Sequence, residues 1–569
     1  MKYRQLLTYI MFGLAAMNAT AEPLDTGKKA KNSNPRVEKI PSVSTEDIIN
    51  ILIQQKLIDE KKLAEILNKA RSQTQNDFGA AVETIEAAEK DDASAVEDGV
   101  VRVPYVPQYI RDDIREKVRM ELREEVVGDV MSQAEKQRWG VPGTTPHWTH
   151  KIIWSGDIRL RAESILFDDK NNNISSRIAY KDVNAINDRG GFSTNLLEDL
   201  ININDDRTRL PTRLRLGMNA KVTSGIEAQA RLVTGKSSDP VSTNQTLGNY
   251  GESFAISFDR ANLKYKRFEG DYEVVGGRFQ NPFVHTDLVW DSDYQFDGLA
   301  GTYWLRHGDN WEEEDIQFDP FVIAGLFPID EIDQEPNDKW LYALQLGFNY
   351  EWLDQDKLTF AIAYYHYENI TGEINQPEGF ETDYTAPDFV QKGNTLFDIK
   401  NELDGSENLL ALLADYHLIN ATVIYDIAEF SPHHVILTLD VVKNIGLDKG
   451  EMDKRAGGAA SVFNTADNRV EERELGVQAG VTFGWPAVTQ RGQWQGSLFF
   501  KNLERDATLD AFTDSDFHLG GTDGKGFIVK ARYGFSDNTV FQFKWLSSEA
   551  VDGNDLGVDI YQFDVSAKF

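Results

Sequence analysis

Apolar and polar residues alternate one by one in many segments after Trp148. In the segment that ends at Phe569, one face carries Tyr561, Phe563, Val565, Ala567 and Phe569, and the other carries Gln562, Asp564, Ser566 and Lys568. A period of two is typical of a β-strand with one apolar and one hydrated face. In lipid such a strand persists only inside a closed barrel, because every backbone N–H and C=O must be paired there. The same pattern also fits the edge strand of a soluble sandwich.

About sixteen segments follow this pattern, an even number as single-chain bacterial barrels require. Their approximate centres are residues 157, 215, 229, 259, 274, 301, 321, 346, 362, 422, 438, 480, 498, 530, 543 and 564. In the fourth segment the pattern changes phase near Asp259 and Arg260, which predicts a β-bulge.

The connections between these segments alternate between short turns and long polar loops. The short ones lie near residues 223–225, 268–270, 354–356 and 536–538, and the long ones cover 167–206, 236–252, 369–416, 443–473 and 503–524. This alternation is typical of a transmembrane barrel with periplasmic turns and extracellular loops, and a soluble sandwich has no reason to show it. We therefore predict an all-β transmembrane barrel of about 16 antiparallel strands over residues 148–569, preceded by a periplasmic helical segment.

The residues before the barrel are predicted to form four consecutive parts. Residues 1–21 are typical of a secretory signal peptide, with the small-x-small site Ala19-Thr20-Ala21 before the cut. Residues 22–43 form a polar linker, 44–103 hold short helices and an acidic linker, and 104–140 form an amphipathic helix with an apolar residue at every fourth position. Its narrow stripe favours a coiled coil or a docking helix in the periplasm, although it also suits a single helix lying against the barrel mouth.

Composition narrows the function classes. The chain has 0 Cys, which excludes disulfides and thiolate metal sites. Its formal net charge of -33 argues against nucleic acid as a partner, because a phosphate backbone would repel such a surface. The mean hydropathy of -0.44 is compatible with a barrel, in which only every second strand residue faces lipid.

Arginines gather on the predicted inward faces of neighbouring strands: Arg159, Arg161, Arg209, Arg213, Arg215 and Arg231. A barrel of about sixteen strands encloses a water-filled channel, so these side chains are predicted to line it as a basic wall. Asp287, Asp291 and Asp293 follow in the connection after the fifth strand. If that connection folds into the lumen, it narrows the channel and sets carboxylates across from the arginines, and charged rings of this kind set ion selectivity. The alternative is a solvated wall, with the arginines paired to Asp157, Glu163 and Glu227.

One long motif resembles a known family. The run Gly277-Arg278-Phe279-Gln280-Asn281-Pro282-Phe283, continued by Thr286-Asp287-Leu288-Val289-Trp290-Asp291 and Asp297-Gly298-Leu299-Ala300, is similar to a signature of the "putative porin" family of Gram-negative bacteria. The resemblance implies an outer-membrane channel for passive diffusion of small hydrophilic solutes or ions, often a homo-trimer, and implies no particular solute. Phe569 resembles the terminal signal read by the barrel-assembly machinery, although Ala567 replaces the aromatic residue often found two positions earlier. Outer-membrane lipids and lipopolysaccharide are the other expected partners.

Other functions compete with this reading. An outer-membrane enzyme is not expected, because the sequence has no Gly-x-Ser-x-Gly elbow, P-loop or His-Glu-x-x-His helix. The histidine pairs 147/150 and 433/434 are expected at interfaces or turns rather than in a metal site, and no cofactor is predicted. A gated receptor needs about 22 strands and a plug domain. A substrate-selective channel for anions, phosphate or sugars remains the main alternative, with Trp304, Phe321 and Tyr365 as a possible stacking track or simple lumen filling.

Overall fold

The computed structural model describes residues 151–267, 272–305, 317–333, 336–352, 355–401, 407–457, 462–463 and 470–569. The chain divides into two units, Met1–Lys136 and Gln137–Phe569, and every described residue belongs to the second. The predicted signal peptide, linker and helices, and the histidine pair 147/150, lie outside the described residues.

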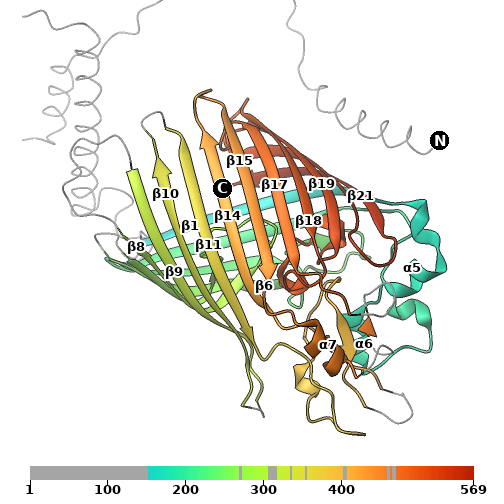
Figure 1. Ribbon diagram of the computed structural model, residues 1–569. Coiled ribbons are helices and arrows are strands. Elements are labelled where there is room, and N and C mark those ends of the chain that lie inside the picture. The colour runs from blue at the N-terminus through green and yellow to red at the C-terminus, as the bar shows by residue number, and fades with distance from the viewer. Residues whose placement is uncertain are drawn as a thin grey trace, which may run out of the picture. The chain divides into compact units, whose positions relative to one another are not determined.

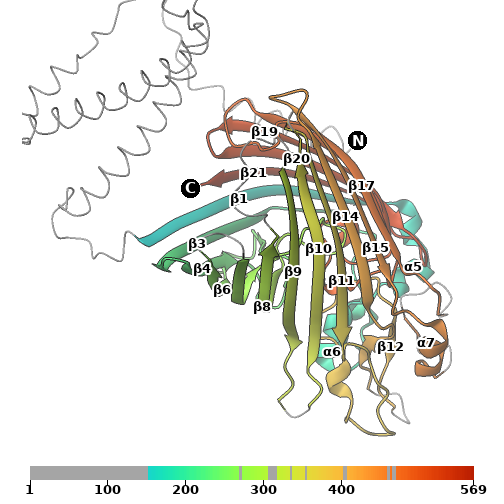
Figure 2. The ribbon, with the colours of Figure 1, turned by 60° about the vertical axis from the view of Figure 1, so that its left-hand side comes forward.

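The described part is built around one antiparallel sheet that closes into a barrel (Figures 1 and 2). Sixteen of its 18 strands form the wall, and the other two, β2 (Arg207–Arg209) and β5 (Gln245–Thr246), extend it locally. The wall strands are β1 (Ile152–Phe167), β3 (Pro211–Thr223), β4 (Ile226–Thr234), β6 (Ile256–Lys266), β7 (Tyr272–Gln280), β8 (Gln295–Trp304), β9 (Gln317–Asp330), β10 (Lys339–Glu351), β11 (Lys357–Glu368), β14 (His417–Ile427), β15 (His434–Asn444), β17 (Leu475–Gly484), β18 (Trp494–Leu503), β19 (Gly524–Ser536), β20 (Thr539–Ala550) and β21 (Gly557–Lys568). All sixteen predicted centres fall within these strands, so the predicted barrel is confirmed.

The barrel closes between its first and last strands. β1 pairs antiparallel with β21 from Asp157 opposite Lys568 to Phe167 opposite Val558. At the end of this seam, Gly156 and Phe569 exchange two backbone hydrogen bonds of 2.8 and 2.9 Å. Closure leaves no strand edge unpaired, which is the condition for a sheet in lipid.

The predicted bulge is also confirmed. Arg231 of β4 lies opposite Arg260 of β6, whereas the next residue, Leu232, lies opposite Phe258. Asp259 is therefore the extra residue on β6, as the change of phase in the sequence indicated.

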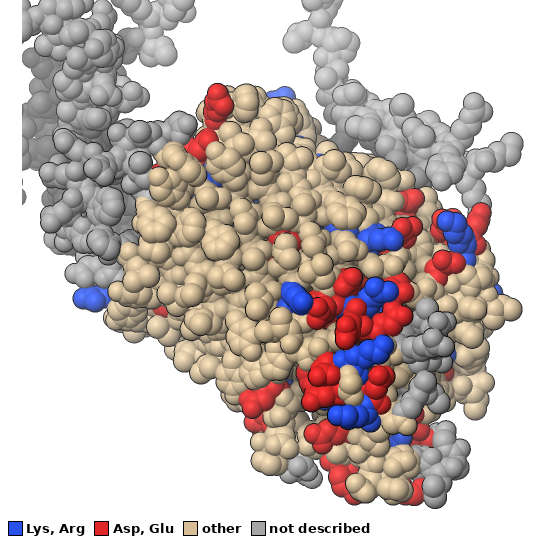
Figure 3. Space-filling model, viewed as in Figure 1, with Lys and Arg blue, Asp and Glu red and all other residues tan. Residues whose placement is uncertain are grey.

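The alternating residues of each strand place apolar side chains on the outer face of the barrel and polar side chains on its inner face. On β21 the side chains of Phe563 and Val565 are exposed on the outer face, whereas Gln562 and Asp564 between them are buried. Figure 3 shows the outer wall covered mainly by uncharged residues, with charged side chains gathered towards the end that carries the loops. An apolar exterior is what a lipid-embedded barrel requires.

The two ends of the barrel differ. Short turns join the strands at one end, and at the other the long connections carry the helices α5 (Ile174–Ala179), α6 (Val183–Arg189) and α7 (Lys449–Arg455) (Figure 1). The same end holds a small sheet of β12 (Leu396–Asp398), β13 (Leu410–Leu412) and β16 (Val462–Phe463), and the 3-10 turns η3 (Asp169–Asn172), η4 (Leu196–Asp199), η5 (Asp383–Thr385), η7 (Asp510–Phe512) and η8 (Phe517–Leu519). No helix in the described ranges is long and apolar enough to cross a membrane.

Candidate functional site

The connection between β7 and β8, residues 281–294, lies inside the barrel; we call it the β7–β8 loop. Trp290 is its largest fully buried side chain, with no exposed surface. Its ring centroid lies 4.7 Å from that of Phe296, 5.3 Å from Tyr365 and 5.9 Å from Phe512. Packed aromatic rings of this kind hold the loop to the inner face of the wall.

The hairpin that carries this loop starts from two glycines that face each other. Gly277 of β7 pairs with Gly298 of β8, and both have positive φ, 114° and 137°. A Cβ on Gly298 would lie 2.2 Å from the carbonyl oxygen of Leu326 on β9. Only glycine fits this backbone, which explains why the family-like motif has glycine at both positions.

The β7–β8 loop is anchored by charge on two sides of the barrel. Asp293 forms ion pairs with Arg215 and, at 3.7 Å, with Arg213, both on β3. Asp287 lies 3.4 Å from the Nζ of Lys530 on β19, and its carbonyl accepts a hydrogen bond of 2.8 Å from Lys501 on β18. Because six strands separate β8 from β18 along one side of the wall, the loop crosses the interior.

The three loop carboxyls differ in their protonation. Burial would raise the pKa of Asp287, but Lys530, Lys544 and Lys501 together lower it to about 2. Burial likewise opposes the ionisation of Asp293, but Arg215 and Arg213 hold its pKa below the ordinary value. Burial and the neighbouring carboxyls of Asp293 and Asp514 instead raise the pKa of Asp291 well above that value. The surroundings therefore favour the charged form of Asp287 and Asp293, the two anchors, and disfavour it for Asp291.

Asp291 joins the β7–β8 loop to a second inward segment, residues 504–523 between β18 and β19. Its backbone N–H donates to the carbonyl of Phe512 at 2.7 Å, and its side chain accepts from the N–H of Ser515 at 2.9 Å. Asn394 of the β11–β14 connection donates to the carbonyls of Arg505 and Thr508, at 2.7 and 2.8 Å. Segments from three loops are thus interlocked inside the barrel mouth.

The predicted arginine wall is made of paired side chains. Arg161, 4% exposed, lies 2.7 Å from Asp564 and 3.0 Å from Asp516. The other ion pairs are Arg209 with Glu163, Arg213 with Asp157 and Asp293, Arg215 with Asp293, and Arg231 with Asp259. Arg159 donates to the Asn244 side chain. Two of the three carboxylates expected for the solvated-wall alternative, Asp157 and Glu163, are among these partners, whereas Glu227 accepts from Asn219.

The sequence pattern predicted some of the residues that are neighbours in this interior and did not indicate others. It grouped Arg213, Arg215 and Asp293, which are in contact. It did not identify Lys501 and Lys530 as partners of Asp287. The aromatic candidates Phe321 and Tyr365 are buried in the main apolar cluster, with Trp304 packed against it.

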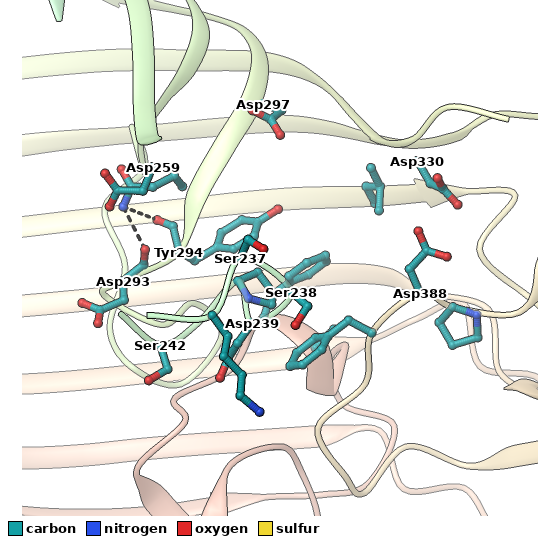
Figure 4. Close-up of a pocket in the computed structure, with 18 of the residues that line it drawn as sticks. Ser237, Ser238, Asp239, Ser242, Asp259, Asp293, Tyr294, Asp297, Asp330 and Asp388 are labelled. Carbon is teal, nitrogen blue, oxygen red and sulfur yellow. Dashed lines mark hydrogen bonds between the residues drawn. The ribbon is translucent and has the colours of Figure 1, made fainter. Parts of the chain in front are cut away.

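A cavity of about 390 Å³ lies beside these anchors, between the wall and the inward loops (Figure 4). The strands β4, β6, β7, β8, β9 and β10 supply its wall side. Its loop side is formed by residues 236–243, 293–294, 387–390 and 509–512. Seven of the residues around it are aspartates: Asp239, Asp259, Asp293, Asp297, Asp330, Asp388 and Asp510.

Among the described histidines, His366 and His417 stack with their Nδ1 atoms 2.7 Å apart, whereas the predicted pair 433/434 makes other contacts. His433 packs its ring 4.1 Å from that of Trp485, and His434 lies 2.7 Å from Asp426. Within the described ranges, no group of three or more His, Cys, Asp and Glu side chains is arranged to hold a metal ion.

The fold and this interior define a transmembrane β-barrel with an apolar outer wall, a charged interior and loops folded inward. A family model described as "Putative porin" matches residues 42–569, and the chain belongs to this family. The protein is therefore an outer-membrane channel of the porin class.

Solved structures with similarity to this chain include the following two. One is the high-pH structure of Pseudomonas putida OprB, with 9% identity, a TM-score of 0.39, and coverage of 74% of this chain and 95% of that chain. The other is the outer membrane channel DcaP of Acinetobacter baumannii, with 10% identity, a TM-score of 0.37, and coverage of 74% and 97%. No curated protein matches the chain.

Proposed function

We propose that this protein forms a water-filled channel through which small hydrophilic solutes or ions diffuse passively across the outer membrane. The crossing of the β7–β8 loop supports this most directly, because its charged anchors on β3 and on β18 and β19 hold it across a polar interior, which it narrows. The family assignment supports the same class of function.

In this proposal the arginine wall and the loop carboxylates set ion selectivity together. The arginines of the wall are held at fixed places by their partners, as Arg213 is by Asp157 at 2.8 Å. A permeating ion therefore meets alternating fixed charges rather than one basic face, and their balance decides which sign passes more easily. This argues for weak selectivity and does not favour a channel specific for anions or phosphate.

The remaining expectations extend the proposal to assembly. We propose that the barrel acts as a homo-trimer surrounded by outer-membrane lipids and lipopolysaccharide, with its N-terminal helices in the periplasm. The pairing of Phe569 with Gly156 at the closing seam agrees with a role of that residue in recognition by the barrel-assembly machinery.

Single-channel recording tests the proposal. The refolded, detergent-purified protein is inserted into a planar bilayer, and the reversal potential is measured across a salt gradient, with heat-denatured protein as the control. Large, persistent ohmic steps are expected, and steps in groups of three would support a trimer. A barrel that migrates as folded on a gel without heating, yet gives no conductance, would contradict the proposal.

A further inference from the structure

The cavity beside the β7–β8 loop has two chemically different sides. One side is aromatic and apolar: the ring of Tyr294 lies 4.6 Å from that of Phe512, centroid to centroid, and Phe389 and Ile329 extend this side. The rest of the cavity, on several sides of these rings, carries the aspartates labelled in Figure 4. A pocket with an apolar body and a few placed polar groups is the usual form of a small-molecule site, and its volume of about 390 Å³ suits a ligand of one ring.

The charges of this cavity do not cancel. Four of its seven aspartates have a cationic partner: Asp259 with Arg231, Asp293 with Arg215, Asp297 with Arg278 and Asp330 with Lys339. The other three, Asp239, Asp388 and Asp510, form no ion pair with any residue that the structure describes. Lys236 is the one cationic residue of the lining that likewise has no ion pair with a described residue.

Of these three aspartates, Asp510 is also held away from water and Asp239 is half-buried. Asp510 is 1% exposed, and its Oδ1 has no hydrogen-bond partner among the described residues. Burial raises the pKa of Asp510 to about 7 and raises that of Asp239 above the ordinary value. Lys236 acts on Asp239 and Lys392 acts on Asp510, but neither forms an ion pair with a described residue, and burial still raises both pKa values. A further positive charge entering the cavity would therefore relieve part of the cost of burying these carboxyls.

The arginines of the neighbouring wall strengthen the assignment. Arg213, Arg215 and Arg231 lie close to the cavity but are already paired with Asp157, Asp293 and Asp259. An anionic solute would have to compete with these carboxylates for its partner. A cationic solute would meet carboxylates that have none.

We propose that this cavity binds small organic cations, namely amines that carry one aromatic or aliphatic body, at the loop-bearing end of the channel. The ammonium group would face one of the carboxylates that lack an ion pair, Asp239 or Asp388, and the body would lie against Tyr294 and Phe512, where a ring can also attract the positive charge. This inference rests on the proposed function of the barrel as a channel, because it names a class of solute that would bind transiently while it permeates.

Three probes with the same aromatic body separate charge from shape. They are tyramine (cationic), 4-ethylphenol (neutral) and 4-hydroxyphenylacetate (anionic). Tyramine is expected to interrupt the single-channel current at concentrations about tenfold lower than either other probe, since one ion contact is worth roughly this factor. Equal interruption by all three would overturn the proposal.

The double variant Asp239→Asn, Asp388→Asn tests the assigned carboxylates. Asp388 is exposed and neither residue forms a described ion pair, so the barrel is expected to fold normally, as gel migration without heating will show. Tyramine should then interrupt the current about tenfold less effectively. The matched control is Asp537→Asn, in the short β19–β20 turn at the other end of the barrel, and it should leave the effect of tyramine unchanged. An unchanged effect in the double variant would overturn the proposal.

Titration calorimetry of the detergent-solubilised barrel separates this inference from the proposed function. If the folded barrel conducts no ions but still binds tyramine, with weaker binding in the double variant, the channel proposal fails and the cation site stands. If the barrel conducts but binds tyramine no better than 4-hydroxyphenylacetate, the cation site fails and the channel proposal stands.

Discussion

Replacing Asp293 by Asn removes the charge that holds the β7–β8 loop to β3. The Nη1 of Arg213 lies 3.7 Å from Asp293, Arg215 is also bonded to it, and the three side chains are 11–14% exposed. At an effective dielectric constant of about 20, one pair at this distance represents roughly 4.5 kcal/mol of attraction. Removing one partner of a buried ion pair lowers the free energy of unfolding by about 3–5 kcal/mol. Because this pair keeps some exposure to solvent, we expect Asp293→Asn to lower it by about 2–3 kcal/mol.

The consequence should appear in ion flow. Asp293→Asn leaves two arginines of the interior without this carboxylate, so the reversal potential in a salt gradient should shift towards anions. Weaker anchoring should also increase the conductance or its fluctuations, because the loop crosses the interior. Both quantities are read from single channels in a planar bilayer, on protein whose gel migration shows a folded barrel.

A matched substitution shows whether the effect depends on burial. Asp297→Asn removes a carboxylate of the same cavity, but its pair with Arg278 is 42% and 49% exposed. Exposed pairs contribute only about 0–1 kcal/mol, so this variant should change selectivity and conductance much less. If Asp293→Asn leaves both quantities as in the wild type, or if Asp297→Asn changes them equally, the reasoning is refuted.

Three further predictions concern the loop, the hairpin and the effect of pH. Trp290→Ala should release the loop at a cost of about 3–5 kcal/mol and increase proteolysis within 281–294, whereas Trp154→Ala, on the exposed outer face, should not. Gly298→Ala should lower the yield of folded barrel on gels, because its Cβ would lie 2.2 Å from a carbonyl oxygen; Gly301→Ala on the same strand, with 3.9 Å to the nearest atom, should fold normally, and equal yields would contradict the steric argument. Burial raises the pKa of Asp510 to about 7, so the folded protein holds a proton that the unfolded chain has lost, and stability against urea should fall as the pH rises from about 4 to 7. Asp510→Asn should reduce this dependence of stability on pH. An unchanged dependence would mean that it comes from the charged groups that act on Asp510, namely Asp506 and Lys392.

The wall could be predicted from the sequence because a barrel in lipid repeats one rule at every strand. Each strand shows its outer face to lipid and its inner face to polar groups, so the alternation of Phe563 and Asp564 is visible without any knowledge of their neighbours. Even the bulge at Asp259 was visible, since an extra residue shifts the phase of the pattern.

The interior could be predicted only in part, because its contacts join residues far apart in the chain. Lys501 and Lys530 have the pattern of ordinary inward residues, and nothing local indicates that Asp287 reaches them. One signal was present in the sequence: Leu288, Val289 and Trp290 form an apolar run within a connection, and such a run is expected to be buried. The same reasoning would have identified Phe512 in the connection after β18.

The seam between β1 and β21 also has a consequence for the kinetics of folding. Arg161 and Asp564, which lie 2.7 Å apart across it, are separated by 403 residues in the sequence. Contacts at such a separation are slow to form, because most of the chain's conformational freedom must be lost before they stabilise anything. Until the seam forms, two strands with apolar faces present unpaired N–H and C=O groups, and such edges readily pair with other chains. A catalyst of assembly would therefore act most effectively by holding these two strands until they meet.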